Sequence, residues 1–87
     1  MIIHQIVDQI YKKEREIYRT TNRSSISLVI YIEYRMWQKM MGEIKTTGQY
    51  SSLESELLHT KGEKIMDHRM YRVLENDHGI VVIEKES

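Results

Sequence analysis

Four histidines are the residues best suited to acid–base chemistry or to binding a metal: His4, His59, His68 and His78. No two of them have the HxH or HExxH spacing by which neighbouring side chains hold one zinc ion. Asp67 and Asp77 each precede a histidine, but adjacent residues of a strand point to opposite faces, and the second pair falls in a turn-rich stretch. We therefore predict no metal site and no cofactor.

Nucleophilic catalysis and phosphate binding also lack their usual patterns. The chain contains no Cys, so it has neither a thiolate nucleophile nor a disulfide. No serine stands in a G-x-S-x-G turn, and the four glycines are scattered, so the sequence has no phosphate-binding loop. These features favour a protein that is not an enzyme.

A basic cluster near the N-terminus offers a different chemistry. It consists of Lys12, Lys13, Arg15, Arg19 and Arg23. Cations at this density can follow a phosphate backbone, and Tyr11 and Tyr18 between them could stack on bases. Arg72 is a further candidate phosphate contact. Both tyrosines fall on the apolar side of a predicted helix, which favours packing over stacking on bases. Nucleic-acid binding is therefore the alternative hypothesis.

The charges of the whole chain cancel, with 13 Lys and Arg against 13 Asp and Glu. A protein that coats nucleic acid or binds a membrane surface through its charge needs a strong positive field. Residues 1–44 carry seven basic and five acidic side chains, and residues 45–87 carry six and eight. This opposition of the two halves suits self-association at least as well as phosphate binding.

The length of 87 residues supports one core, so we expect a single small domain over residues 1–87. The longest apolar run, residues 26–32, is far shorter than the roughly 20 residues that span a bilayer. His4 and Asp8 follow the first apolar residues, where a signal peptide would carry a basic and then an apolar segment. We predict a cytoplasmic protein with no membrane contact.

The first predicted element is an amphipathic helix over residues 3–19, which positions most of the basic cluster and the two tyrosines. Its apolar residues recur at helical spacing, while Asp8, Lys12 and Glu16 form a charged ladder on the other side. Glu14 is the exception, because it projects into the middle of the apolar side. It needs a partner if that side is covered.

Residues 27–32 allow two interpretations. They are rich in β-branched and aromatic side chains and have no helical period, which favours a buried strand. In the alternative, they begin a second helix that runs to residue 44 and completes an N-terminal helical hairpin. We expect the strand.

Two helices and two strands follow in the prediction. Residues 33–44 regain the helical period, and Ser51 with Glu54 forms a capping box for a short helix that ends at Gly62. Residues 70–74 and 80–83 flank a turn-rich stretch and are expected to pair as a C-terminal β-hairpin, with residue 73 opposite residue 82. The second strand is apolar on both faces and is expected to be central in the sheet. The predicted fold class is α+β in the order αβααββ.

Two wide apolar helix faces give this domain more apolar surface than one small sheet covers. The surplus predicts a homo-oligomer or a protein partner. Trp37 and its neighbouring methionines could form a soft binding surface, although their helical spacing also suits a core stripe. The predicted interface residues are Ile3, Val7, Ile10, Tyr11, Glu14, Tyr18, Trp37 and Met41.

From residue 28 onward the chain resembles small phage-encoded α+β proteins of unknown function. The resemblance covers about the last 60 residues and rests on the strand at 28–32, Tyr34-x-x-Trp37, Gly62-x-x-Ile65, and the strands at 71–73 and 79–82. The Tyr71-Arg72-Val73 strand, followed by residues 80–83, also resembles part of the RelE and ParE toxins. That second resemblance implies an mRNA-cleaving or gyrase-directed activity, with Arg72 as a phosphate contact.

The function predicted from the sequence is that of a non-enzymatic protein-interaction module. We expect an oligomeric accessory or regulatory protein of a phage or mobile element that binds a host or viral protein. The alternative is a small nucleic-acid-acting protein, either RNA-binding or a RelE-like toxin. A small ligand at a subunit interface is a third possibility, but no feature of the sequence points to it.

Overall fold

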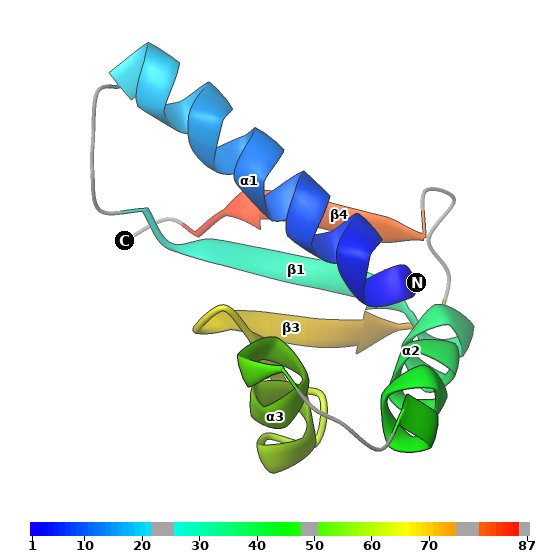
Figure 1. Cartoon of the computed structure of the whole chain (residues 1–87). Helices are drawn as coiled ribbons and strands as arrows, with labels where there is room; N and C mark the ends of the chain where they lie inside the picture. Colours follow the sequence, from blue (N-terminus) through cyan, green and yellow to red (C-terminus); the bar gives the residue numbers. More distant parts are fainter. Residues whose placement is uncertain (22–25, 48–50, 75–78, 86–87) are drawn as a thin grey trace.

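The structure is a computed structural model that describes residues 1–21, 26–47, 51–74 and 79–85. Its helices are α1 (Ile2–Thr21), α2 (Tyr34–Thr47) and α3 (Ser52–His59), and its strands are β1 (Leu28–Glu33), β2 (Lys64–Ile65), β3 (His68–Val73) and β4 (Ile80–Glu84) (Figure 1). The predicted α+β class and the order of elements are confirmed. Residues 28–33 form a strand, so the alternative of an N-terminal helical hairpin is wrong.

The four strands form one sheet in the order β2-β3-β1-β4. β1 is parallel to β3 and antiparallel to β4. The predicted C-terminal hairpin is therefore wrong, because its two strands pair with opposite sides of β1 and not with each other. The expected central place of residues 80–83 is also wrong, since β4 is an edge strand. The most apolar strand, β1, takes the centre, where both of its edges and one face are covered.

A short strand that the sequence patterns did not predict, β2, pairs with β3 through a two-residue turn. The turn residues Met66 and Asp67 both have positive φ, 51° and 64°, as a type I′ turn requires. Their backbone N–H groups donate to the two carboxylate oxygens of Glu56 on α3, at 2.6 and 2.9 Å. These charge-assisted hydrogen bonds offset the strain of two non-glycine residues in this conformation.

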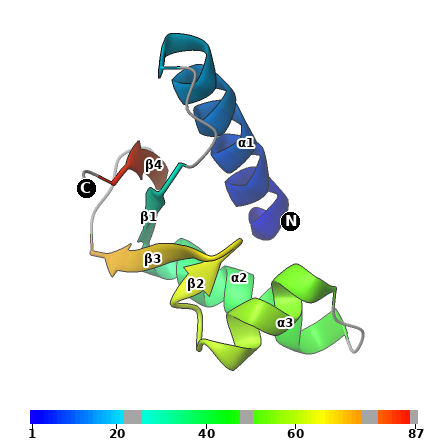
Figure 2. The same cartoon turned by 90° about the vertical axis from the view of Figure 1, so that its left-hand side faces the viewer.

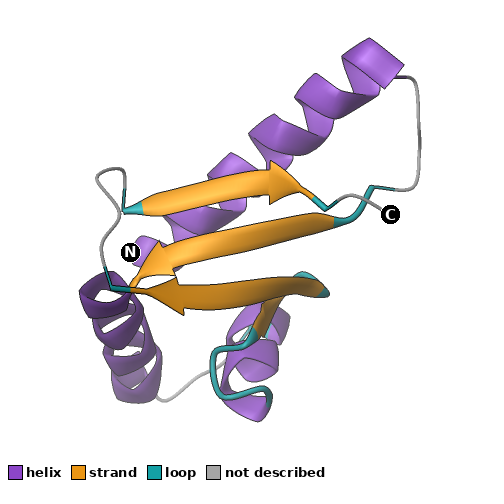
Figure 3. Ribbon diagram, turned by 180° about the vertical axis from the view of Figure 1, so that it is seen from behind, coloured by secondary structure: helices purple, strands orange, loops and turns teal. Residues whose placement is uncertain are grey.

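All three helices lie on one side of the sheet or at its end. α1 crosses the sheet at a slant, and its second half projects past the β4 edge (Figures 1 and 2). Figure 3 shows the opposite side, where no helix of the described chain covers β3, β1 or β4. The sheet therefore has one covered face and one open face.

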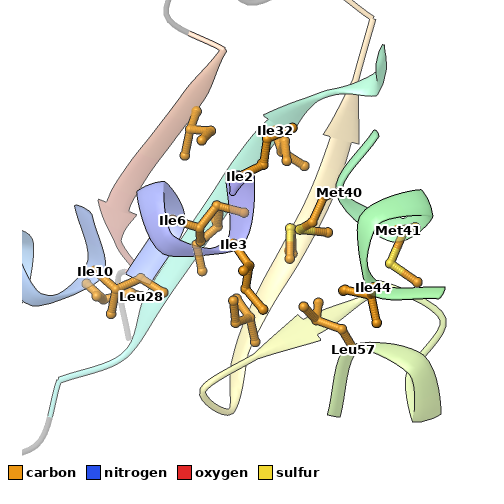
Figure 4. Close-up of a cluster of buried hydrophobic side chains, with 14 of the residues drawn as sticks. Ile2, Ile3, Ile6, Ile10, Leu28, Ile32, Met40, Met41, Ile44 and Leu57 are labelled. Atoms are coloured by element: carbon orange, nitrogen blue, oxygen red, sulfur yellow. The ribbon is translucent and has the colours of Figure 1, made fainter. Parts of the chain in front are cut away.

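The hydrophobic core fills the space between the helices and the covered face (Figure 4). α1 contributes five isoleucines at near-helical spacing, Ile2, Ile3, Ile6, Ile10 and Ile17, and all five are buried. β1 contributes alternate residues, and α2 and α3 add Met40, Met41, Ile44 and Leu57. This core packs α1 against the sheet from Ile2 as far as Ile17.

The short helix α3 has well-defined boundaries. The predicted capping box of α3 is present, because the Ser51 hydroxyl accepts from the Glu54 backbone N–H and the Glu54 carboxylate accepts from the Ser51 backbone N–H. After the C-cap at Thr60, the chain passes through Gly62, whose φ is +76°. The Gly62 carbonyl accepts a hydrogen bond from Trp37 Nε1 at 3.1 Å, which ties α2 to the segment after α3.

Candidate interaction surfaces

The predicted interface residues divide into two groups. Ile3, Ile10 and Met41 are buried in the core of this chain, and Val7 is half-buried against it. Trp37 is also part-buried, between its hydrogen bond to Gly62 and the guanidinium of Arg72, which lies 4.4 Å from the ring centroid. The predicted residues with large exposed or incompletely satisfied side chains are therefore Tyr11, Glu14 and Tyr18.

These three residues and Val7 form one row along α1, which we call the α1 stripe. Its members stand at positions 7, 11, 14 and 18, the spacing of a seam along a helix. A helix turns by about 100° per residue, which places the stripe about a quarter of a turn from the buried isoleucines. Tyr11 and Tyr18 are 52% and 54% exposed. The stripe is thus a largely apolar helix surface that the core leaves open.

Glu14 lies in the middle of the α1 stripe with an unsatisfied oxygen. Its Oε1 atom is shielded from solvent, and within the described part of the chain it has no hydrogen-bond partner. A shielded carboxylate oxygen without a donor costs free energy, so such atoms nearly always have a partner. The sequence predicts that Glu14 needs a partner if this side of α1 is covered. The described part of the single chain does not supply one for this oxygen.

A groove of about 870 Å³ runs beside the stripe. Its lining combines the two tyrosines and Glu14 with charged residues of α1 and one apolar residue before β1: Asp8, Tyr11, Lys12, Glu14, Arg15, Tyr18, Arg19 and Ile26. The groove is apolar at the tyrosines and charged along its outer side. It is large enough to receive side chains of another helix.

The basic residues predicted to contact nucleic acid do not form one surface. Lys12, Arg15 and Arg19 are exposed on α1, and Lys13 forms an ion pair with Glu16 at 3.7 Å. Arg72 lies on β3, where it covers the Trp37 ring. Arg23 lies outside the described residues. The helix cations therefore stand apart from Arg72.

The histidines do not come together in the described chain. His4 and His59 are exposed, while the Nδ1 atom of His68 accepts from the Leu28 backbone N–H at 3.3 Å. His78 lies outside the described residues. No three His, Asp or Glu side chains among the described residues are placed to hold a metal ion. A search of the same residues found no helix with the length and apolar character needed to cross a bilayer.

The open face of the sheet is a second surface, which the sequence analysis missed. Tyr31 on β1 and Tyr71 on β3 are opposite each other in the parallel register, and their ring centroids are 5.7 Å apart. The guanidinium of Arg69 lies over the Tyr71 ring, 5.5 Å from its centroid. Alternation along β3 could have indicated this face, because positions 69, 71 and 73 share one side of the strand.

Comparison with protein families, with curated proteins and with solved structures found no match for this chain. The resemblances to small phage-encoded proteins and to RelE and ParE toxins stay predictions.

Proposed function

We propose that this protein is a non-enzymatic protein-interaction module that self-associates through the α1 stripe. The observation that carries the proposal is the solvent-shielded Glu14 oxygen, which has no hydrogen-bond partner among the described residues and stands between two tyrosines that are more than half exposed. A second copy of the chain would supply both a donor for the oxygen and apolar cover for the tyrosines.

The stripe is complementary to itself when two copies of α1 pair in antiparallel orientation. The two copies are related by a two-fold axis that is perpendicular to both helices and passes between residues 12 and 13. Residues whose numbers add up to 25 then face each other. Tyr11 then faces Glu14 of the partner subunit, and Val7 faces Tyr18 of the partner subunit. Each contact occurs twice, so the Tyr11 hydroxyl of each copy can donate to the orphaned Glu14 oxygen of the other.

The charges beside the stripe favour the same orientation. Asp8 and Arg15 are seven residues apart, so they lie on the same side of α1, outward of the stripe. In the antiparallel pair, Asp8 of one copy approaches Arg15 of the other. A parallel two-fold pair would place the charged flanks of the two helices on opposite sides of the seam, so it would lack these ion pairs. Such exposed ion pairs contribute about 0–1 kcal/mol each, so they select the orientation more than they add affinity.

The second half of α1 projects past the β4 edge (Figures 1 and 3). In the antiparallel pair, the projecting half of each α1 lies beside the packed half of the other. Two tyrosines per copy would become buried, and buried tyrosines are common energetic centres of interfaces.

The proposal is tested by sedimentation velocity over the micromolar range of protein concentration. We expect a dimer, and we expect Tyr18→Asp to raise its Kd by about 30-fold or more, or about 2 kcal/mol. The matched control is Tyr34→Asp, which changes a tyrosine of α2 that is 39% exposed. Circular dichroism checks that each variant keeps the fold. A wild-type monomer, or a dimer that only the control variant dissociates, contradicts the proposal.

A second pair of variants tests the role of Glu14. Tyr11→Phe removes the proposed donor but keeps the ring, so it should weaken the dimer by several-fold. Glu14→Leu removes the buried oxygen, and in combination with Tyr11→Phe it should restore much of the lost affinity. If the fold-changes in Kd of the two single variants simply multiply in the double variant, Tyr11 and Glu14 do not interact across the interface.

The wider role predicted from the sequence stays a proposal, and it names no specific partner. It is that of a cytoplasmic accessory or regulatory protein of a phage or mobile element, which binds a host or viral protein. Affinity capture with the wild-type chain and the Tyr18→Asp variant tests it. A partner retained by both forms would bind elsewhere on the molecule.

A further inference from the structure

The open face of the sheet is organised in rows that run across the strands. Cross-strand partners point to the same face, so the register places Lys64, Arg69, Val29 and Ile83 in one row. The next row, toward the end of β1, consists of Tyr71, Tyr31 and Val81. A cationic and apolar row thus lies directly beside an aromatic row.

The aromatic row stands on the two central strands and is accessible. Tyr71 is 45% exposed, and Tyr31 is partly exposed beside it. Their rings are stacked, with an angle of 25° between the ring planes. No helix of the described chain lies over this face (Figure 3), so the two rings form an aromatic platform at the surface.

The charge next to the platform is positive. Lys64 and Arg69 are exposed, and the guanidinium of Arg69 lies over the Tyr71 ring. Lys85 continues β4 by one residue, because its backbone N–H donates to the Ser27 carbonyl at 2.9 Å, and alternation places its side chain on the same face. The carboxylate of Glu33, the acidic residue of β1 on this face, accepts a hydrogen bond from the Met36 backbone N–H at the start of α2.

We infer that the open face binds single-stranded nucleic acid. Phosphates would follow the row of Lys64 and Arg69 toward Lys85. The Arg69 guanidinium would move from the Tyr71 ring to a phosphate, and the bases would then stack on Tyr71 and Tyr31. Aromatic side chains on the surface of a four-stranded sheet are a known means of stacking unpaired bases, and stacking tolerates any base sequence. A duplex cannot use the platform, because its bases are already stacked. This surface is separate from the α1 stripe, so the inference does not depend on the proposed dimer.

The neutral total charge limits the strength of this binding. Among the described residues, three cations stand on the open face, Lys64, Arg69 and Lys85, so few phosphates can be contacted. For single strands, log affinity falls with log salt by about 0.7 for each phosphate neutralised, which predicts a slope of about −2. Stacking contributes a part of the affinity that salt does not remove.

Fluorescence anisotropy with labelled single strands of uridine or thymidine tests the inference on the full chain. We expect binding at low salt, and we expect Tyr71→Leu to weaken it by about tenfold or more. The matched control is Tyr34→Leu, which should bind as the wild type does. Arg69→Gln should lower the salt slope by about 0.7, whereas Lys39→Gln, an exposed cation on α2, should not change it.

Four results would overturn the inference. They are no binding by the wild type at low salt, equal affinity for a duplex of the same sequence, equal loss in Tyr71→Leu and Tyr34→Leu, or a Tyr71→Leu variant whose sedimentation changes while its nucleic-acid binding does not. The last result would assign the open face to a second copy of the chain. The Tyr18→Asp variant separates the two proposals, because it should lose the dimer and keep the binding.

Discussion

The two faces of the sheet have similar residue types in β1 but very different surroundings. Leu28, Ile30 and Ile32 point toward the helices and are almost completely buried. Val29 and Tyr31 point the other way, beside Ile83, which is 41% exposed on β4. The run Leu28–Ile32 is apolar throughout, as in a strand that is covered on both sides. In this chain the helices cover one side.

The apolar residues of a strand therefore indicate that both of its faces can be buried. They do not indicate which other part of the molecule, if any, covers each face. Three helices in a chain of 87 residues can cover one face of a four-stranded sheet. The other face keeps its aromatic and aliphatic side chains at the surface, and the same holds for the α1 stripe. Such exposed groups are typical of binding sites.

The largest difference between the faces should appear on truncating Ile30. Ile30→Ala leaves a cavity under α1, where Ile30 is fully buried, and should lower the free energy of unfolding by about 4 kcal/mol. Urea denaturation followed by circular dichroism measures the loss. If the variant does not fold, Ile30→Val should lose about 1 kcal/mol. A negligible loss in both variants would mean that this face is not the core.

A substitution at Gly62 should have the next largest effect on the free energy of unfolding, because Gly62 packs closely against Trp37. A Cβ atom at Gly62 would overlap the Trp37 ring, and its φ of +76° disfavours other residues. Gly62→Ala should therefore cost about 2–3 kcal/mol and change the Trp37 fluorescence.

The control for that substitution is Gly42→Ala. Gly42 is exposed on α2, and a Cβ atom there would meet nothing within 4 Å. Alanine favours helix over glycine, so this variant should gain about 1 kcal/mol. Changes of the same sign at both glycines would contradict the packing described for Gly62.

Val29 provides an intermediate test, since it lies on the open face yet is only 8% exposed. Its neighbours in the row, Arg69 and Ile83, stand on either side of it and can shield it. Val29→Ala should cost about 1–2 kcal/mol in urea denaturation, less than Ile30→Ala. A loss equal to that of Ile30→Ala would show that a second layer covers this face.

Ile83 should give the smallest effect. Ile83→Thr keeps a β-branched side chain on the open face, where it should change the unfolding free energy by no more than about 0.5 kcal/mol. The measurement is best made at several protein concentrations. A cost above about 1 kcal/mol that grows with concentration would indicate that self-association buries this face.

The elements themselves could be predicted from local patterns. The helical period located α1 and α2, β-branched and aromatic density located β1, and Ser51 with Glu54 located the start of α3. β2 was missed because two residues are too short to show a period. Its turn also lacks the glycine or asparagine that usually indicates such a turn, since the Glu56 carboxylate stabilises Met66 and Asp67 instead.

The candidate surfaces were predicted only in part. Tyr11, Glu14 and Tyr18 follow from their place on the helix as candidates, and their part in an interface stays a prediction. Ile3 and Ile10 were assigned to the same interface because they share the wide apolar side of α1. The slant of α1 across the sheet buried those isoleucines and left the tyrosines outside. The platform of Tyr31 and Tyr71 could not be found along the chain, because 40 residues separate its two members.

The sequence by itself determined which segments are helix and strand, except for β2, as well as the cap of α3 and the unusual place of a carboxylate on the apolar side of α1. These depend on interactions among residues a few positions apart. Tertiary structure alone decided that β1 lies between β3 and β4, which face of the sheet the helices cover, and which apolar residues of α1 stay exposed. Each of these depends on which of several distant segments packs against a given apolar surface. Patterns among neighbouring residues do not indicate that choice.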